Sequence, residues 1–396
     1  MAANACDTVP TEVLVLIFSY IPTQVLLRTV ALVCKKFDDI LKSEWYWKAR
    51  HSPYVKHFPV EFEDVRQRQL ACAQFDVLTA GGSRDPKENS FTLRGPTGAV
   101  DCVLLLNPDL HGTNAVIAAG ARDGNIYLWR RRREETPGRS MRSFTGSVLS
   151  EHMGWVWSLG SDPTSTSLLC SGGWDNKVLL WDVAAGQRVE FIGAHKFPVL
   201  SLLFPESHVL MTGCFDKQIR EFDVRKPISQ TSTLSGHRGP VLCLGSTGHY
   251  VFSASDDKTV CVWDRRTLKR LQKVTHSSII TWLHYDHGIL TVTEGGKPTG
   301  NVNVYSVTGG QLDFLKAFNP GHSRPLTCVS HNLAMIATSS QDGLVNLHSW
   351  NLADKPLLSL NNHKGNSISR IHWNGSMLAA SGGDMTVSLW VPKSAS

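Results

Sequence analysis

The pattern of hydrophobic and polar positions differs between the two ends of the chain. In the first fifty residues, apolar side chains such as Leu14, Phe18 and Ile21 recur at three- and four-residue intervals, which is helical periodicity. From about residue 90 onward, short apolar runs such as 199–204 are separated by turns that contain Gly, Asp or Asn, which is typical of buried strands. We therefore predict a small helical module at 7–50, a helical stalk or linker at 51–88, and a strand-built domain at 89–396.

The strand-built domain consists of seven copies of one repeat. Residues 171–182 and 253–264 match position by position, and most copies share a turn aspartate that is followed six residues later by Trp or another large residue. The turn aspartates are Asp123, Asp175, Asp216, Asp257, Asp342 and Asp384. Twice the usual spacing separates Asp257 from Asp342, so a degenerate copy lies between them, with Tyr305 in the Trp position. Each copy has the apolar runs and turns of four short strands, which predicts a mainly β fold.

A histidine precedes the first strand of six of these copies. Gly-His, Asp and Trp-Asp at these offsets resemble the WD40 repeat, whose fold is a β-propeller of four-stranded blades. The resemblance covers about three quarters of the chain and implies a seven-bladed WD40 β-propeller. It also implies a hydrogen-bonded network within each blade, which His152, Ser171, Asp175 and Trp181 match completely. A catalytic role for these residues is the alternative, but a satisfied buried network explains why they recur.

Three copies depart from the pattern. The fifth lacks the aspartate and the sixth has His348 in the Trp position, so we expect those two blades to be less rigid. The last copy ends with its third strand, 387–390, six residues before the end of the sequence. Because an open sheet edge invites aggregation, its outer strand must come from elsewhere. Residues 90–93, directly before the first copy, are placed to supply that strand.

The helical module carries a resemblance of its own. Residues 9–14, 17–21, 26–28, 33–37 and 47–48 closely resemble the F-box, which implies a three-helix module that docks on the adaptor Skp1 within a cullin-RING ubiquitin ligase. The positions that match the family's adaptor-facing pattern are Pro10, Ile17, Leu26, Val33, Cys34 and Trp47. Two departures are that Val9 replaces the usual Leu and that 21–34 is one residue longer, which leaves the register of Leu26 against Leu27 open.

The helical module is also too small to bury all its apolar surface alone, so part of it is expected to face a partner. The alternative is that the module packs entirely onto the propeller.

Together the two modules resemble the F-box/WD40-repeat protein family. That resemblance implies a noncatalytic substrate-recognition subunit of an SCF-type (Skp1-cullin-F-box) E3 ubiquitin ligase, whose propeller binds a protein for ubiquitination and degradation. We expect a monomer within that complex. The alternatives are a WD40 interaction scaffold independent of a ubiquitin ligase, and an enzyme that uses the centre of the propeller. No P-loop, GxGxxG, HExxH or GxSxG motif supports catalysis.

WD40 propellers generally bind peptides on the face made by the loops that hold the repeat's His and Asp. The candidate substrate-binding residues on these loops are Arg122, Trp155, Trp174, Phe197, Phe215, Arg238, Arg324 and Gln341. Exposed aromatic residues beside arginines suit peptide binding, whereas the alternative is that the rings pack on one another under the loops. A phosphorylated substrate would require several basic groups around one phosphate. The candidates for that role are Arg122, Arg238, Arg324 and Lys364.

Composition excludes several other classes of protein. With 42% hydrophobic and 19% charged residues the chain is neither disordered nor a coiled coil, and a net charge of +6 is too small to argue for nucleic acid or a membrane surface. Nine cysteines without a CxxC pair argue against a disulfide framework and a thiolate zinc site, so we expect a reducing compartment, the cytoplasm or the nucleus. His284 and His287 lack a third metal ligand. We also expect no cofactor, no metal and no signal peptide or membrane span.

Overall fold

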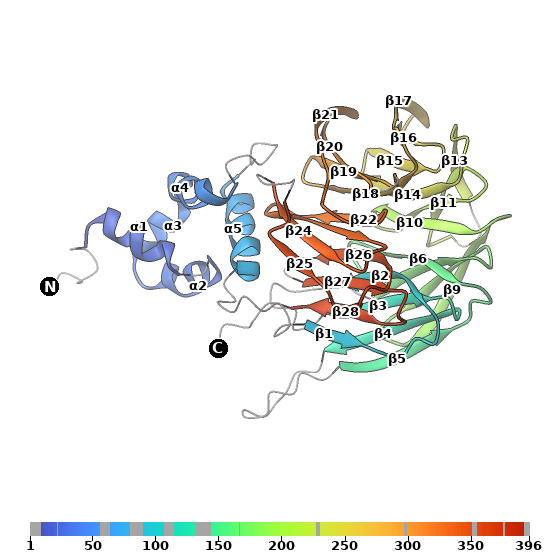
Figure 1. Ribbon diagram of the computed structural model, residues 1–396, viewed down its shortest axis with the longest axis horizontal. Helices are drawn as coiled ribbons and strands as arrows, with labels where there is room; N and C mark the ends of the chain where they lie inside the picture. The colour runs from blue at the N-terminus through green and yellow to red at the C-terminus, as the bar shows by residue number, and fades with distance from the viewer. Residues whose placement is uncertain are drawn as a thin grey trace.

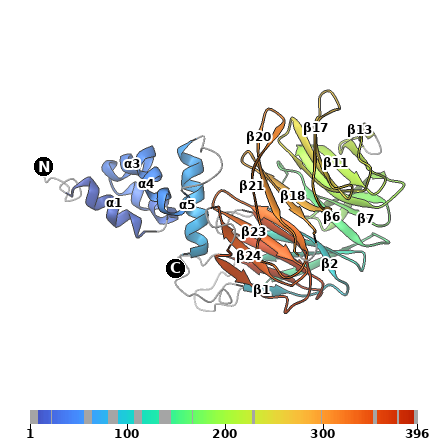
Figure 2. The ribbon, with the colours of Figure 1, turned by 45° about the horizontal axis from the view of Figure 1, so that its top comes forward.

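The structure is a computed structural model that describes residues 9–21, 23–55, 64–79, 90–106, 115–131, 144–165, 167–226, 230–296, 299–350, 355–374 and 377–391. Figure 1 shows the N-terminal helices in blue on one side of a ring of strands. Figure 2 shows the same separation from a second direction, with helix α5 (Val65–Thr79) between the other helices and the strands. In this part of the chain, no helix combines the length and the apolar character needed to cross a membrane.

The helical module has one apolar core. Its helices are α1 (Thr11–Ser19), α2 (Thr23–Arg28), the 3-10 helix η2 (Val30–Leu32), α3 (Lys35–Lys42), α4 (Glu44–Val55) and α5 (Val65–Thr79). Helix α1 begins after Pro10, whose carbonyl accepts hydrogen bonds from the amides of Val13 and Leu14 at 3.2 and 3.1 Å. Leu14 and Phe18 lie one turn apart and point inward together. They pack in one cluster with Leu26, Ile40, Leu41, Tyr46, Trp47 and Cys72.

Helix α5 belongs to this helical core, although its residues were predicted to form a stalk. Cys72 lies in the apolar cluster described above. The side-chain amide of Gln69 donates to the Leu41 carbonyl at 3.2 Å, and Arg68 lies 3.8 Å from the Glu44 carboxylate. Residues 56–63 and 80–89 of the predicted linker lie outside the described residues.

The strands form seven four-stranded sheets, so the predicted seven-bladed, mainly β architecture is confirmed. Blade one contains β2 (Val100–Leu106), β3 (Val116–Ala121), β4 (Asn125–Arg131) and β5 (Phe144–Ser150). Blade two contains β6 (Val156–Ser161), β7 (Leu168–Gly173), β8 (Lys177–Asp182) and β9 (Gln187–Ala194). Blade three contains β10 (Val199–Glu206), β11 (Val209–Cys214), β12 (Gln218–Asp223) and β13 (Gln230–Ser235). Blade four contains β14 (Val241–Ser246), β15 (Tyr250–Ser255), β16 (Thr259–Asp264) and β17 (Lys269–Thr275). Blade five contains β18 (Ile280–Asp286), β19 (Ile289–Glu294), β20 (Val302–Thr308) and β21 (Gln311–Phe318). Blade six contains β22 (Leu326–His331), β23 (Met335–Ser340), β24 (Val345–Ser349) and β25 (Leu358–Leu360). Blade seven contains β26 (Ile368–Asn374), β27 (Met377–Gly382), β28 (Val387–Trp390) and β1 (Ser90–Leu93).

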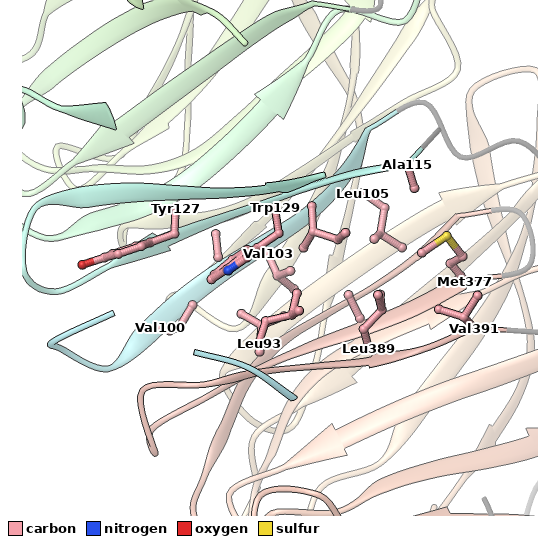
Figure 3. Close-up of a cluster of buried hydrophobic side chains, with 14 of the residues drawn as sticks. Leu93, Val100, Val103, Leu105, Ala115, Tyr127, Trp129, Met377, Leu389 and Val391 are labelled. Atoms are coloured by element: carbon pink, nitrogen blue, oxygen red, sulfur yellow. The ribbon is translucent and has the colours of Figure 1, made fainter. Parts of the chain in front are cut away.

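The ring closes through β1, as the repeat count predicted. This strand pairs antiparallel with β28, with Leu93 opposite Val387 and Ser90 opposite Trp390. Leu93 is 5% exposed and packs in a cluster that joins blade seven to blade one. Figure 3 shows this cluster, in which Leu389 and Met377 of blade seven approach Val103 and Leu105 of blade one. The first strand and the last three strands of the domain are therefore one structural unit.

Neighbouring blades approach closely because small residues face the next inner strand. A Cβ atom added at Gly172 would lie 2.7 Å from a Val199 methyl group, and one added at Gly213 would lie 2.8 Å from a Val241 methyl group. Both distances are too short for real contacts, so these positions in β7 and β11 accept only glycine without a shift of the blades. Inner strands consequently contact one another all round the ring, including β26 with β2.

Candidate functional site

Two blades contain the complete hydrogen-bonded network that the WD40 resemblance implies. His152 Nδ1 lies 2.8 Å from the Asp175 carboxylate and its Nε2 lies 2.7 Å from Ser171 Oγ, which also accepts a hydrogen bond from Trp181 at 2.7 Å. His237, Ser253, Asp257 and Trp263 repeat the same arrangement in blade four. Because a carboxylate only accepts, Nδ1 carries the proton and the serine hydroxyl donates to Nε2. The network ties the loop before each blade to the turn between its middle strands.

Burial and hydrogen bonding have opposite effects on the turn aspartates of this network. Burial raises the pKa of Asp257, but hydrogen bonds from Thr259, the Arg238 amide and His237 outweigh it and hold the pKa at about 2. The same balance holds the pKa of Asp342 at about 2, with His322 as the main hydrogen-bond partner. These carboxylates are therefore ionised and fully engaged at neutral pH, which fits a structural role.

Blade five, which lacks the turn aspartate, has rebuilt its network around Glu294. One oxygen of Glu294 lies 2.8 Å from His276 Nδ1 and accepts from Asn303 at 3.1 Å, and the other accepts from Ser277 at 2.7 Å. Tyr305 places its hydroxyl 3.4 Å from His276 Nε2. Glu294 ends β19, opposite Ile280, and its extra methylene group lets it reach the histidine from there. The blade thus keeps a buried hydrogen-bonded network that is built from other residues.

Blade six also keeps its network, although His348 stands in the Trp position. His322 Nε2 lies 3.0 Å from Thr338 Oγ1, and His322 Nδ1 lies 3.0 Å from the Asp342 carboxylate. His348 Nε2 lies 3.3 Å from the same Thr338 oxygen, where a tryptophan nitrogen would donate. The departures from the repeat in blades five and six are therefore each compensated by other residues of the same blade.

Blade three contains the one group of residues in the described part of the chain that could hold a metal ion. His195, Cys214 and Asp216 place their ligand atoms within 4.8 Å of one another. Arg220, however, lies between them: its guanidinium is 2.8 Å from His195 Nδ1 and 2.5 Å from the Asp216 carboxylate. Burial raises the pKa of Cys214 to about 11, and burial together with Arg220 lowers the pKa of His195 to about 4. An arginine that occupies two ligands does not fit a cation site.

The predicted aromatic residues of blades two and three lie on the loop face and pack in two pairs. Trp155 and Trp174 are 39% and 44% exposed, with ring centroids 5.3 Å apart. Phe197 and Phe215 are 48% and 45% exposed, with centroids 6.5 Å apart. Each ring therefore packs against a partner and still presents nearly half of its surface. We call these four residues the aromatic shelf.

Arginine lies beside the aromatic shelf on one side. The Arg122 guanidinium lies 4.5 Å from the Trp155 ring centroid, and it donates to both oxygens of the Asp101 carboxylate at 2.9 and 3.1 Å. Trp157, which the sequence did not single out, packs against Trp174 with centroids 6.1 Å apart. Asp101 holds Arg122 in place, so the cation and the ring form a preorganised surface.

The other predicted loop residues lie on different blades. Arg238, Arg324 and Gln341 are exposed on blades four and six. The Arg238 amide donates to the Asp257 carboxylate at 2.7 Å, and the Arg324 carbonyl accepts from Ser340 at 2.8 Å. Among the described residues no hydrogen bond or ion pair links these side chains to the aromatic shelf. Of the eight predicted residues, the structure brings Arg122, Trp155 and Trp174 together, and it pairs Phe197 with Phe215 on the next blade.

The helical module exposes an apolar face on α1. Val13, Leu16, Ile17 and Tyr20 are 44%, 60%, 48% and 83% exposed, and their spacing places them on the side of the helix opposite Leu14 and Phe18. Leu32, which ends η2, and Val33, which follows it, are 82% and 58% exposed. We call these six residues the α1–η2 face. Apolar side chains with this much exposure on one small module are the mark of an interaction surface.

Two residues predicted to face the adaptor lie elsewhere. Leu26 and Trp47 have no exposed surface, because they fill the core against Leu14 and Phe18. Trp47 also donates its ring N–H to the Leu41 carbonyl at 2.6 Å. Pro10, Ile17 and Val33 are exposed, and Cys34 is half-buried. Sequence reasoning missed Leu16 and Tyr20, whose signal is the second apolar stripe that α1 carries beside its inward one, and it also missed Leu32 of η2.

Comparisons with known proteins identify the same two modules. The F-box-like family model matches residues 6–52, and the WD domain, G-beta repeat model matches residues 87–130, 143–182, 228–264, 313–349 and 354–391. The WD matches leave out the first three strands of blades three and five. Those are the blades whose networks contain Arg220 and Glu294.

Relatives with this combination of modules match most of the chain. F-box/WD repeat-containing protein 9 of Homo sapiens is 28% identical over 97% of this chain and 82% of its own length. F-box/WD repeat-containing protein mec-15 of Caenorhabditis elegans is 24% identical over 83% of this chain and 88% of its own length. The solved WD40 β-propeller domain of Doa1 is similar in fold, with a TM-score of 0.63 and 20% identity over 76% of this chain and 95% of that one. With both family models matched and both modules present in the structure, the chain belongs to the F-box/WD-repeat protein family.

Proposed function

We propose that this protein is the substrate-recognition subunit of an SCF-type ubiquitin ligase. In this proposal the α1–η2 face binds Skp1, and through it a cullin-RING ligase, while the propeller binds the protein to be ubiquitinated. The observation that carries it is the pairing of an F-box with a WD40 propeller, which implies a substrate-adaptor role. The protein supplies no catalytic group: it raises the effective concentration of substrate lysines near the ubiquitin-charged enzyme.

The adaptor half of the proposal is supported by the burial pattern of α1. A helix that faced only its own core would place polar residues outward, yet Leu16 and Tyr20 are more than half exposed. Burying a leucine side chain in an interface contributes roughly 1.5–3 kcal/mol, so a few such residues suffice for stable binding. The partner we infer is an apolar, helical surface of the adaptor.

The substrate half is supported by the aromatic shelf and Arg122. Aromatic and arginine side chains dominate the energetics of protein interfaces, and here they are held in position by Asp101 and by one another. We expect this recognition to take place in the cytoplasm, the nucleus or both. Whether the bound segment is phosphorylated is decided by phosphatase treatment before capture.

The adaptor contact is tested by co-purification of the full chain with Skp1. We expect the double substitution Leu16→Asp, Leu32→Asp to reduce Skp1 retention at least tenfold, because two exposed apolar anchors become charged. Val189→Asp is the matched control, since Val189 is an equally apolar residue that is 51% exposed on the outer strand of blade two. If the wild-type chain does not retain Skp1, or the double variant retains it fully, the proposed adaptor contact is wrong, and a ligase-independent scaffold is favoured.

The substrate contact is tested by the proteins that the chain recovers from cells. The double substitution Trp174→Ala, Phe215→Ala should abolish recovery of proteins whose ubiquitination depends on this chain, while Skp1 retention stays unchanged. Phe314→Ala is the control, because Phe314 is 59% exposed on the outer strand of blade five, away from the loop face. Unchanged recovery by a folded double variant would place substrate binding on another surface.

A further inference from the structure

Strand β17, the outer strand of blade four, carries a concentration of positive charge that the other outer strands lack. Its seven residues include Lys269, Arg270 and Lys273, all exposed, and no acidic residue. The outer strands of the other six blades, β5, β9, β13, β21, β25 and β1, each have a formal net charge of zero. The whole chain has a net charge of +6, and β17 alone supplies three positive charges.

The positive charge continues at both ends of the strand. Arg266 is exposed in the turn between β16 and β17. Lys258 is exposed directly before β16, and it lies beside the far end of β17 because its carbonyl accepts a hydrogen bond from the His276 amide at 2.8 Å. Five cationic side chains therefore follow the outer hairpin of blade four. We call strand β17 with these two flanking residues the β17 edge.

No acidic group in the described part of the chain forms an ion pair with these five side chains. Asp264 lies opposite Lys269, but its carboxylate accepts hydrogen bonds from the Thr267 hydroxyl at 2.8 Å and the Thr267 amide at 3.3 Å. Arg270 donates to the neutral Gly236 carbonyl at 3.3 Å. The charges of the β17 edge are therefore available to an anionic partner.

A bulge places two of these cations on the same face of the sheet. The pairing of β16 with β17 shifts register at Trp263, so that Arg270 lies opposite Trp263 and Lys273 lies opposite Cys261. Cys261 and Trp263 are two positions apart in β16 and share a face, so Arg270 and Lys273 share that face too. Burial lowers the pKa of His237, and the charges of Lys273 and Arg270 lower it further, which agrees with a common direction of the two side chains.

The strand also offers a free backbone edge and apolar contacts. Strand β17 ends the order β14-β15-β16-β17, so its outer edge pairs with no described strand. Leu268 and Leu271 are 44% and 50% exposed among the cations. Figure 1 shows β17 at the rim of the ring, away from the helical module. Lysines on an edge strand also serve to prevent edge-to-edge aggregation, but that role does not call for exposed leucines beside them.

We propose that the β17 edge binds an acidic, extended segment of a partner protein. The segment adds a strand to blade four: its backbone pairs with the free edge, its carboxylates face Arg270 and Lys273, and its apolar side chains contact Leu271. Charge complementarity selects an acidic partner. A strand edge favours a peptide over single-stranded nucleic acid, which stacks on aromatic rings, because no described aromatic residue of blade four is among the exposed ones. This surface lies on the side of the propeller and does not depend on the proposed adaptor role.

Binding of synthetic peptides to the full chain tests the proposal. The probe is a fluorescein-labelled peptide that alternates glutamate with valine, and fluorescence anisotropy measures its binding. We expect the double substitution Arg270→Glu, Lys273→Glu to weaken binding at least about tenfold, because it reverses two charges that face the peptide. The matched control is Arg324→Glu, Lys364→Glu, which makes the same change in net charge at exposed residues before blades six and seven. This control should bind the peptide as the wild type does.

A second peptide and a salt series separate strand pairing from charge alone. A peptide with proline in place of every valine keeps the carboxylates but loses half of its N–H donors, so it should bind at least about tenfold more weakly. Raising sodium chloride from about 0.05 M to about 0.5 M should weaken binding of the valine peptide, because salt screens exposed charges. A peptide that alternates lysine with valine should not bind.

Several outcomes would overturn the inference. One is equal binding of the glutamate–valine peptide by the wild type and by a folded charge-reversal variant; if that variant does not fold, Arg270→Gln, Lys273→Gln provides the comparison. Another is no binding by the wild type, in which case larger oligomers of the glutamine variant would show that the cations only prevent aggregation. Binding of phosphatidylserine vesicles or single-stranded DNA instead of the peptide would assign the β17 edge to a membrane or a nucleic acid, which also overturns it.

Discussion

Individual residues of the hydrogen-bonded network differ from the repeat in blades three, five and six. Glu294 replaces the missing aspartate of blade five, His348 replaces a tryptophan in blade six, and Arg220 joins the histidine and the aspartate of blade three. In each case the histidine of the blade retains hydrogen bonds on its ring. The reason is energetic, since an orphaned buried polar group costs about 1–3 kcal/mol.

Glu294 is therefore a structural residue whose contribution to the free energy of unfolding can be measured. We expect Glu294→Ala to lower the free energy of unfolding by about 2–4 kcal/mol, because His276, Ser277 and Asn303 lose their shared acceptor. Urea denaturation measures the loss. Asp256→Ala, which removes an exposed carboxylate from blade four, should change it by less than about 0.5 kcal/mol. A loss for Glu294→Ala as small as that of the control would contradict the role.

At the scale of elements, strand β1 has the largest consequence, because it joins the two ends of the propeller domain. Strand β1 precedes all other strands in the sequence but pairs with the last one, β28. Its four residues turn an open row of blades into a ring, which removes the exposed edge that an outer strand would otherwise leave on blade seven.

A substitution at Leu93 tests how much the pairing of β1 with β28 contributes to the stability of the propeller. Leu93→Ala should destabilise the propeller by about 2–5 kcal/mol, since it deletes a buried side chain from the cluster between blades seven and one. Thr92→Ala is the control, because Thr92 lies on the same strand with its side chain exposed. Equal unfolding midpoints in urea for the two variants would show that β1 is dispensable.

Much of the element scale could be predicted from the sequence, because a repeat and a period-two pattern are local signals. The seven blades and the closing role of residues 90–93 follow from counting strands. The orientation of α1 could not be predicted, since Leu14 and Leu16 are equally apolar and only packing decides that one faces the core. Leu26 and Trp47 match the adaptor-facing pattern of the F-box, and only the packing shows that they face the core. Glu294 could not be predicted, because it ends strand β19, whereas the aspartate of other blades lies in the turn after the strand.

At the scale of the whole molecule, burial of histidines couples folding to pH. Burial lowers the pKa of His372 to about 4 and that of His331 to about 3, and it holds the pKa of His284 well below its usual value. His195 has a pKa of about 4 through burial and Arg220. All four are neutral in the folded protein, whereas they titrate near pH 6.5 in the unfolded chain.

The unfolded chain therefore binds more protons than the folded one once the pH falls below about 6.5. We expect the free energy of unfolding to be highest above that value and to decrease as the pH falls toward 4, by up to about 1.4 kcal/mol per pH unit and histidine. The carboxylates with lowered pKa, such as Asp257, add to this only below about pH 4. Asp286, whose pKa is raised by burial, opposes it in part.

Urea denaturation between pH 7.5 and 4.5 measures this dependence. His372→Asn keeps an acceptor for the Leu105 amide, which lies 3.2 Å from His372 Nδ1, but it removes the titrating group. Its stability should therefore fall less steeply with decreasing pH than that of the wild type. A wild-type stability that is constant or increases over this range would refute the assignment of neutral buried histidines.

The pairing of β1 with β28 also has a consequence during synthesis of the protein on the ribosome. The ribosome releases the helical module and β1 first, and at about 5–20 residues per second β28 follows roughly 15–60 s later. Throughout that interval the nascent chain displays a finished α1–η2 face attached to an unfinished ring. If the α1–η2 face binds an adaptor as proposed, a chain that ends before the four residues of β28 would keep that face but lack a closed propeller.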